Sequence, residues 1–148
     1  MKNYFNFENS NVLILGASSG FGKIYSETFY DLGANVISVA RNYSKLKKIK
    51  SECEYRNKNG SINVFKCDVN SEKDVNQLIK KIKKQYRQLN IVIYCCGCNV
   101  RQLFVDIQPQ DFNYVMKTNY FSAFNLFKKI YPMLKNSKYA RIINLTSI

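Results

Sequence analysis

The stretch 15–22, Leu-Gly-Ala-Ser-Ser-Gly-Phe-Gly, has the residue types and the spacing of a phosphate-binding turn. It follows an apolar run and precedes a helical pattern, so it lies between a strand and a helix. Glycines there let the backbone approach a pyrophosphate, and the N–H groups at the helix N-terminus attract the anion. The candidate phosphate-binding residues are Gly16, Ser18, Ser19, Gly20, Phe21 and Gly22. A glycine turn that opens a helix without any ligand is the alternative interpretation.

A basic residue, Arg41, follows the second apolar run, at 34–39. In dinucleotide-binding βαβ units, an acidic residue at this place binds the ribose hydroxyls of NAD, whereas an arginine accommodates the 2′-phosphate of NADP. An arginine that is merely exposed after a strand is the alternative. We therefore expect the cofactor to be NADP(H).

Histidine is absent from the sequence, and five cysteines are present. Without histidine, the Ser-His-Asp and Cys-His catalytic arrangements and the His-containing zinc sites are excluded. Three of the cysteines lie in the cluster Cys-Cys-Gly-Cys at 95–98, but only Cys53 and Cys67 lie elsewhere, so a matching second pair of metal ligands is lacking. We expect free thiols and no metal site, since an odd number of cysteines also argues against a closed disulfide set.

Five apolar runs alternate with amphipathic segments along the chain, which is typical of an α/β protein. The expected strands are at 12–15, 34–39, 62–65, 91–94 and 141–145. The expected helices begin near Gly20, Tyr43, Ser71 and Pro109. Crossovers of this length connect parallel strands with a right-handed turn. We predict a Rossmann-type, doubly wound parallel sheet that is truncated after the fifth strand, in a domain at 11–148 that follows an N-terminal extension at 1–10.

Each expected helix has one apolar face that can pack on the sheet. The faces comprise Phe21, Ile24, Tyr25, Thr28, Phe29 and Leu32; then, in a helix at 43–59, Leu46, Ile49 and Cys53; then Val75, Leu78, Ile79 and Ile82; and finally Phe112, Val115, Met116, Asn119, Ala123, Leu126 and Phe127. Asn119 is the polar exception, because an amide among apolar side chains must find partners or cost roughly 1 to 3 kcal/mol. We expect it to be a structural bridge or part of a site.

The formal net charge of +13 raises the question of nucleic-acid binding. Much of that charge lies at 45–50 and 80–87, on the outer faces of expected helices, which favours a solvated surface. We therefore expect no nucleic-acid partner. The sequence also has no apolar segment suited to a signal peptide or to crossing a bilayer, so we expect a soluble, cytoplasmic protein with no membrane partner.

Taken in chain order, these landmarks resemble those of the short-chain dehydrogenases/reductases, from about residue 11 to residue 148. They are the Gly-x-x-x-Gly-x-Gly turn, Asp68 after the third strand, Gly97 after the fourth, Thr118-Asn119 in the long helix and Asn144-Leu145-Thr146-Ser147 after the fifth. The segments at 97–101, 115–119 and 132–135 are similar to the tropinone-reductase-like branch.

The chain departs from the pattern of this family at two places. Leu15 replaces a Thr before the first glycine, which removes one hydroxyl contact. The residues at 94–97 are Tyr-Cys-Cys-Gly where relatives usually have Asn-Asn-Ala-Gly, so Cys95 replaces an amide that braces the central sheet.

The resemblance implies roles for several residues of this sequence. Asp68, with Val69, would lie beside the adenine ring, although a turn or N-cap aspartate is the alternative. Cys95 and Gly97 would also bind the cofactor. Asn119 would help to hold a proton-relay water, and Ser147 would hydrogen-bond the substrate carbonyl.

The general acid of relatives is a Tyr with a Lys four residues on, and we expect it beyond residue 148. Two strings with this spacing, Tyr43 to Lys47 and Tyr131 to Lys135, are interpreted as chance in a sequence so rich in Tyr and Lys. We therefore expect the chain alone to be inactive.

The sequence predicts an NADP(H)-dependent oxidoreductase that transfers a hydride between the nicotinamide and a small carbonyl or alcohol substrate. The alternatives are a non-catalytic NADP(H)-binding or interaction module and, less favoured, a basic nucleic-acid-binding protein. The open edge of the fifth strand and the apolar side chains of Phe121 and Phe124 predict a homo-oligomer in the full-length form.

Overall fold

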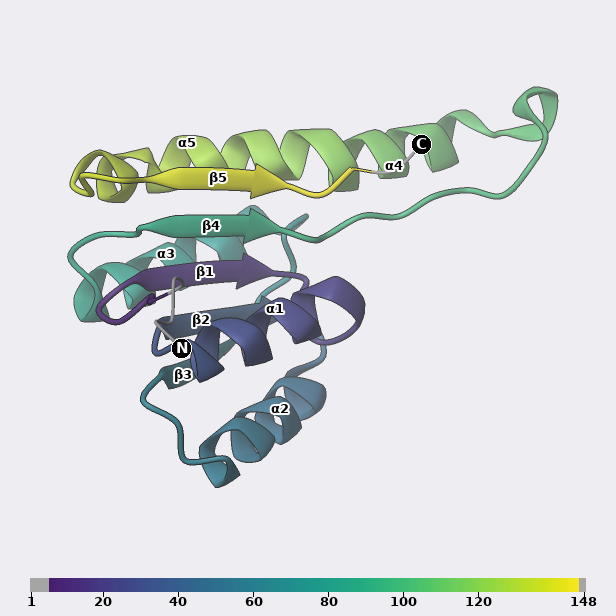
Figure 1. Cartoon of the computed structure of the whole chain (residues 1–148). Coiled ribbons are helices and arrows are strands. Elements are labelled where there is room, and N and C mark those ends of the chain that lie inside the picture. Colours follow the sequence, from purple (N-terminus) through teal and green to yellow (C-terminus); the bar gives the residue numbers. More distant parts are fainter. Residues whose placement is uncertain (1–5, 147–148) are drawn as a thin grey trace.

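A computed structural model describes residues 6–146, and it contains one sheet of five parallel strands (Figure 1). The strands are β1 (Asn11–Leu15), β2 (Asn35–Ala40), β3 (Ser61–Lys66), β4 (Ile91–Tyr94) and β5 (Arg141–Asn144). Their order is β3-β2-β1-β4-β5. The chain adds β2 and β3 on one side of β1 and then β4 and β5 on the other side, so the switch point of the sheet lies between β1 and β4. In open α/β sheets of this kind, ligands bind at that switch point, beyond the carboxyl ends of the strands.

Helices cover both faces of the sheet, as expected for a doubly wound fold (Figure 1). They are α1 (Gly20–Asp31), α2 (Tyr43–Tyr55), α3 (Glu72–Gln85), α4 (Pro109–Met116) and α5 (Ser122–Lys135), with a 3-10 turn, η1 (Phe104–Asp106), and a π-helical turn, η2 (Lys117–Phe121). The predicted Rossmann-type architecture is thereby confirmed.

Alternate residues of the central strands build two separate cores. Val12, Ile14 and Val36 face α1 and α2, where they pack with buried side chains such as Leu46 and Ile49. The opposite set faces α3 and α5, and it includes Leu13, Leu15, Ile37, Val39, Val92 and Tyr94. Because both faces are covered, the two central strands, β1 and β4, are apolar along nearly their whole length rather than alternating.

The observed helices differ from the expected ones in three respects. The second helix ends at Tyr55 rather than at 59. Phe21 and Ile24 are 65% and 53% exposed, so the inner face of α1 is narrower than the sequence pattern indicated. The long helix is divided by η2, whose wider turn rotates the positions after Met116 relative to those before it.

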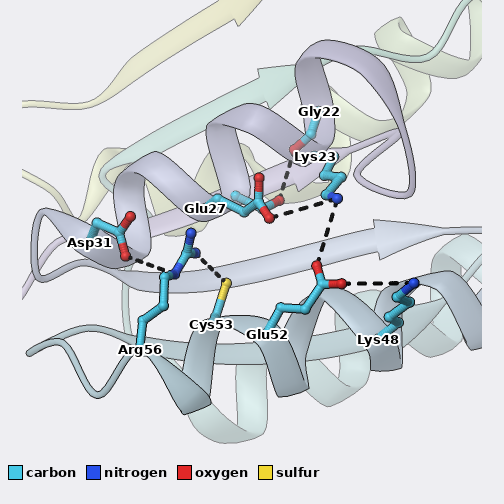
Figure 2. Close-up of polar contacts among 9 residues, drawn as sticks. Gly22, Lys23, Glu27, Asp31, Lys48, Glu52, Cys53 and Arg56 are labelled. Carbon is cyan, nitrogen blue, oxygen red and sulfur yellow. Dashed lines mark hydrogen bonds and ion pairs between the residues drawn. The ribbon is translucent and has the colours of Figure 1, made fainter.

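Helices α1 and α2 are joined by a chain of charged side chains, and Figure 2 shows Lys23 between Glu27 and Glu52. Lys23 Nζ lies 3.6 Å from a carboxylate oxygen of Glu52, and Arg56 Nε lies 3.3 Å from Asp31 Oδ1. Exposed pairs of this kind each contribute at most about 1 kcal/mol. They link α1, which begins at Gly20 of the glycine turn, to α2.

Strand β5 pairs with β4 alone among the described strands, and Ile142 and Ile143 are each more than two fifths exposed. The outer surface of the α4–α5 segment also exposes Phe112, Phe121 and Phe124. Within residues 6–146, no helix has the length and apolarity required to span a membrane.

Candidate functional site

The glycine turn lies at the switch point, between the carboxyl end of β1 and the start of α1. Gly16 has φ +81° and donates its N–H to the Val39 carbonyl, 2.9 Å away in β2. A Cβ on Gly16 would lie 2.8 Å from the Cys95 carbonyl oxygen, and a Cβ on Gly22 would lie 2.3 Å from the Gly16 carbonyl oxygen. The turn therefore fits its surroundings only with glycine at both positions.

The N-terminus of α1 suits an anion. Ser19 is its N-cap, but the Ser19 side chain makes no capping hydrogen bond, and the first turn contains no acidic residue. The free N–H groups of that turn therefore have no carboxylate of the same turn beside them that would repel an anion.

A buried hydroxyl chain fixes the start of α1 on the sheet. Ser38 in β2 donates to Ser26 Oγ at 2.8 Å, and Ser26 donates to the Gly22 carbonyl at 2.8 Å. Both serines are fully buried, so these bonds are strong constraints on where α1 begins.

Two adjoining cavities lie at the carboxyl ends of the strands. The smaller, of about 240 Å³, is lined by Gly16, Ser18, Ser19, Val39, Ala40, Arg41, Asn42, Cys67, Asp68, Val69, Asn70, Cys95, Cys96, Gly97 and Thr118. The larger, of about 960 Å³, is lined by Gly16, Ser19, Gly20, Phe21, Gly22, Cys95, Cys96, Gly97, Cys98, Asn99, Arg101, Asn119, Asn144, Leu145 and Thr146. They share the first glycine and the 95–97 segment, so together they form one cleft along the switch point.

The structure brings all of the residues that the sequence singled out within the described range to this cleft. Arg41, Asp68 and Val69 line the smaller cavity, and Asn119 lines the larger one. Ser147, the remaining candidate, lies outside the described residues. The cleft is therefore the candidate site, although the role of each residue in it remains a prediction.

Asp68 takes part in a local turn. Its Oδ1 accepts the backbone N–H of Asn70 at 2.9 Å, and its own N–H donates to Asp74 Oδ2 at 3.1 Å. Ser71 caps α3, as expected, by accepting from the N–H of Asp74 at 3.3 Å. The turn holds Asp68 and Val69 against the smaller cavity.

Asn70 is a cleft residue that the sequence reasoning missed. Its Nδ2 donates to Thr118 Oγ1 at 2.7 Å, which joins the turn after β3 to the π-helical turn η2. Among the described residues, Asn70 Oδ1 is the buried side-chain oxygen that has no hydrogen-bond partner. The signal for Asn70 was its place just after a strand, beyond the carboxyl end where ligands bind.

Asn119 is exposed and forms a two-point bridge to the segment after β4. Its Oδ1 accepts the N–H of Cys98 at 2.9 Å, and its Nδ2 donates to the Cys98 carbonyl at 2.8 Å. This is the hydrogen-bonding expected of a structural bridge, and Asn119 also lines the larger cavity. The π-helical turn explains why an amide from an otherwise apolar stripe reaches this segment rather than the core.

Tyr94 holds the π-helical turn to the sheet. It is fully buried at the end of β4, and its hydroxyl lies 2.9 Å from the Thr118 carbonyl and within hydrogen-bond distance of Ser122 Oγ. Burial raises the pKa of the Tyr94 phenol, so it remains a neutral donor. The sequence marked Tyr94 as a departure from its family pattern but could not show this contact.

We expect Tyr94→Phe to lower the free energy of unfolding by roughly 1 to 2 kcal/mol, because the loss of a buried hydroxyl leaves its partners less well bonded. It should also speed hydrogen exchange at the Cys98 amide, since the turn that carries Asn119 loses its anchor to the sheet. Denaturant titration and amide exchange measure the two effects. Tyr139→Phe, at a 63% exposed tyrosine, is the matched control and should change neither. Equal exchange at Cys98 in both variants would refute the anchoring role.

Thiols line much of the cleft. All five cysteines are free, and burial raises the pKa of Cys95 to about 11 and that of Cys67 and Cys96 to about 12. No group of three or more metal-ligating side chains with suitable geometry occurs in the part of the chain that the structure describes.

The two Tyr-x-x-x-Lys strings lie outside this cleft. Tyr43 and Lys47 are on α2, where the Lys47 Nζ lies 5.5 Å from the centroid of the Tyr43 ring. Tyr131 and Lys135 are on α5, and Tyr131 is 61% exposed. Neither pair lines either cavity.

The strand order, the helices on both faces and the cleft at the switch point define a Rossmann-type α/β protein. The chain belongs to the short chain dehydrogenase family, because the model of that family matches residues 10–148. The chain spans about half the length of the curated relatives that it matches.

Two of these relatives are 30% identical to the chain. A fatty acyl-CoA reductase of Acinetobacter baylyi matches over 97% of this chain and 48% of its own length. A tropinone reductase homolog of Arabidopsis thaliana matches over 91% of this chain and 50% of its own length. The 3-oxoacyl-[acyl-carrier-protein] reductase FabG of Escherichia coli is 26% identical over 97% of this chain and 57% of its own length.

Solved structures share the fold. The Pseudomonas aeruginosa RhlG/NADP active-site complex superposes with a TM-score of 0.89, covering 99% of this chain and 58% of that one at 22% identity. A short-chain type dehydrogenase/reductase from Mycobacterium ulcerans gives a TM-score of 0.88 at 20% identity, covering 96% of this chain and 52% of that one.

Proposed function

We propose that this chain is the NADP(H)-binding part of a short-chain oxidoreductase. The observation that carries the proposal is that Arg41 lines one cavity at the switch point of the sheet together with the first part of the glycine turn, namely Gly16, Ser18 and Ser19. A diphosphate against the N-terminus of α1 leaves the adenosine end of a dinucleotide pointing toward β2, where Arg41 follows the strand. The complex of RhlG, a structural neighbour, contains NADP by its name, which is consistent with this cofactor.

The residues present fit such a cofactor. Gly20 lines the larger cavity, and no atom lies within 4 Å of a Cβ added there, so a diphosphate can approach the backbone of the turn closely at this glycine. In the smaller cavity, Asp68 and Val69 would flank the adenine, and the unpartnered Oδ1 of Asn70 offers an acceptor there. Cys95 and Gly97 would bind the middle of the cofactor from the wall that both cavities share.

The larger cavity would take the nicotinamide and the substrate. When bound, the nicotinamide supplies hydride transfer to or from a carbonyl or alcohol carbon. Asn119 lines this cavity and would hold a water for proton relay, and Ser147 would hydrogen-bond the substrate carbonyl. The substrate class is a small carbonyl or alcohol compound, and the general acid would be supplied from outside residues 1–148.

The cofactor preference is tested by titrating the protein with NADPH and NADH. We expect NADPH to bind at least about tenfold more tightly, since a charge-assisted contact to a phosphate contributes roughly 1.5 to 3 kcal/mol. Arg41→Ala should remove that preference and leave NADH affinity nearly unchanged. Arg101→Ala is the matched control, because Arg101 lines the larger cavity and should leave the ratio of the two affinities intact. An Arg41→Ala protein that keeps its preference would remove the case for NADP.

The second candidate is a non-catalytic NADP(H)-binding or interaction module. It is favoured by one observation, namely that neither Tyr-x-x-x-Lys pair of this chain lines the cleft. NADPH oxidation with a panel of carbonyl compounds tests this candidate. Under either candidate the chain alone should bind NADPH without turnover, so turnover by the chain alone would exclude the module.

Three further expectations belong to this proposal. Residues 11–148 form the cofactor-binding domain after an extension at 1–10. The full-length protein forms a homo-oligomer, which is supported by the exposed Phe121 and Phe124. It works in the cytoplasm, which is supported by five free thiols, since these persist in a reducing compartment.

A further inference from the structure

Four of the five cysteines line the cleft, although they come from different segments of the sequence. Cys67 follows β3 and lines the smaller cavity, Cys95 and Cys96 follow β4 and line both cavities, and Cys98 lines the larger cavity only. The fifth, Cys53, is buried on α2, where Nη2 of Arg56, the residue after the helix, lies 3.1 Å from its sulfur (Figure 2). The fold thus gathers four thiols at one cleft.

Three thiols of this cluster are weakly nucleophilic. Burial raises the pKa of Cys95 to about 11 and that of Cys67 and Cys96 to about 12, so these three remain protonated and weakly nucleophilic at neutral pH. Cys98 is half-buried and lies on the wall of the larger cavity. Cys95 and Cys96 are also half-buried and also line the larger cavity, but they belong to the wall that both cavities share, whereas Cys98 lines the larger cavity alone.

The position of Cys98 is fixed. Both backbone polar groups of this residue are bonded to the Asn119 side chain, at 2.9 Å and 2.8 Å. A group attached to its sulfur could move out of the cleft only if the segment that carries Cys98 moved, and that movement would break both bonds to Asn119. An attached group of tripeptide size would therefore occupy the larger cavity, whose volume of about 960 Å³ admits it.

The charge of the larger cavity favours an anionic reagent. Arg101 lines the same cavity three residues after Cys98, and no aspartate or glutamate lines it among the described residues. The net charge of +13 attracts anions to the protein as a whole. A thiol compound that carries carboxylates can thus pair with Arg101 while its sulfur reaches Cys98.

We propose that Cys98 is a thiolation site at which a mixed disulfide with an anionic thiol of the glutathione class closes the cleft to the cofactor. This regulation rests on the proposed NADP(H)-binding function. The Cys98 thiolate attacks one sulfur of the oxidised disulfide compound, a new S–S bond forms, and the original S–S bond breaks. The departing thiolate takes up a proton equivalent to the one that Cys98 released, so a reduced thiol is the second product. A second thiol reverses the step and reopens the cleft.

The test uses the reduced chain and oxidised glutathione at neutral pH, with and without saturating NADPH. Peptide mapping by mass spectrometry identifies the modified cysteine, and NADPH titration measures the affinity before and after modification. Cys98→Ser is the informative variant, and Cys53→Ser is the control because Cys53 lies outside the cleft.

We expect glutathione to modify Cys98 before any other cysteine. Saturating NADPH should slow this modification at least about tenfold, because bound cofactor lowers the fraction of open clefts. Modified protein should bind NADPH at least about tenfold more weakly and recover with dithiothreitol. The affinity of Cys98→Ser should be the same before and after treatment, whereas Cys53→Ser should behave as the parent chain.

Two results would overturn the proposal: glutathione on another cysteine first, or a protein modified at Cys98 that binds NADPH as before. Failure of the proposed function looks different. In that case the untreated, reduced chain does not bind NADPH, and control of cofactor binding by Cys98 is excluded as well. Peptide mapping still decides whether Cys98 is the modified residue.

Discussion

Gly22→Ala should destabilise the protein by roughly 3 kcal/mol or more, because the new methyl group meets backbone that cannot move aside. The added Cβ would lie 2.3 Å from the Gly16 carbonyl oxygen and 3.0 Å from the Ala17 Cα. At an ordinary helical position, the same substitution stabilises by about 1 kcal/mol. Loss of stability would thus report the close approach of α1 to the glycine turn, measured as the free energy of unfolding in denaturant.

The same substitution should weaken NADPH binding at least about tenfold, since relief of the clash moves the first-turn amides away from the diphosphate. Gly20→Ala is the matched control, because it lies in the same turn with φ +52° and no atom within 4 Å of the added Cβ. It should cost only about 1 kcal/mol, from the left-handed backbone. If the Gly22→Ala protein were no less stable than the Gly20→Ala protein, the inferred close approach of α1 to the glycine turn would be wrong.

Leu126→Ala should lower the free energy of unfolding by roughly 2 to 5 kcal/mol, the range for a buried leucine that leaves a cavity. Leu126 is fully buried on α5, in the core that this helix shares with α3 and with Leu13 and Val92 of the sheet. The substitution should also raise hydrogen exchange in β4, because α5 covers that part of the sheet. Thermal or denaturant unfolding with amide exchange measures both effects.

Phe124→Ala supplies the contrast on the same helix. Phe124 is 56% exposed, so its loss should change stability by no more than about 0.5 kcal/mol. It should instead reduce self-association, because it removes part of the apolar outer face of α5. Sedimentation at several concentrations measures association. A large stability loss in Phe124→Ala, together with a small one in Leu126→Ala, would mean that α5 packs by its other face.

The helix start at Ser71 and the positions of the strands could be predicted from the sequence. Ser71 was expected to cap a helix and does, because a serine before an acidic first turn satisfies the N–H groups that no helix residue can. Apolar runs that alternate with amphipathic segments indicated the strands, and all five strands occur where they were expected, to within a residue or two. Chain connectivity then restricted these strands to a parallel sheet.

The π-helical turn and its contacts could not be predicted from the sequence. An apolar stripe indicated one continuous helix through Asn119, but the structure widens the turn at Lys117–Phe121. The widened turn is bonded to Tyr94, whose hydroxyl donates to the Thr118 carbonyl from a strand 24 residues away in the sequence. Periodicity records only neighbours along the chain, so it cannot reveal a partner that another element supplies.

The sequence by itself determined the family, the glycine turn and the places where polar residues follow strands, since these depend on residue type and local spacing. Only the tertiary structure decided which of those residues meet. The order β3-β2-β1-β4-β5 brings Arg41, Cys67 and Cys96 to one cavity, although they lie on three different connections. The physical reason is that parallel strands gather their carboxyl ends at one edge of the sheet, and the order of the strands, which buried packing fixes, decides which ends are adjacent.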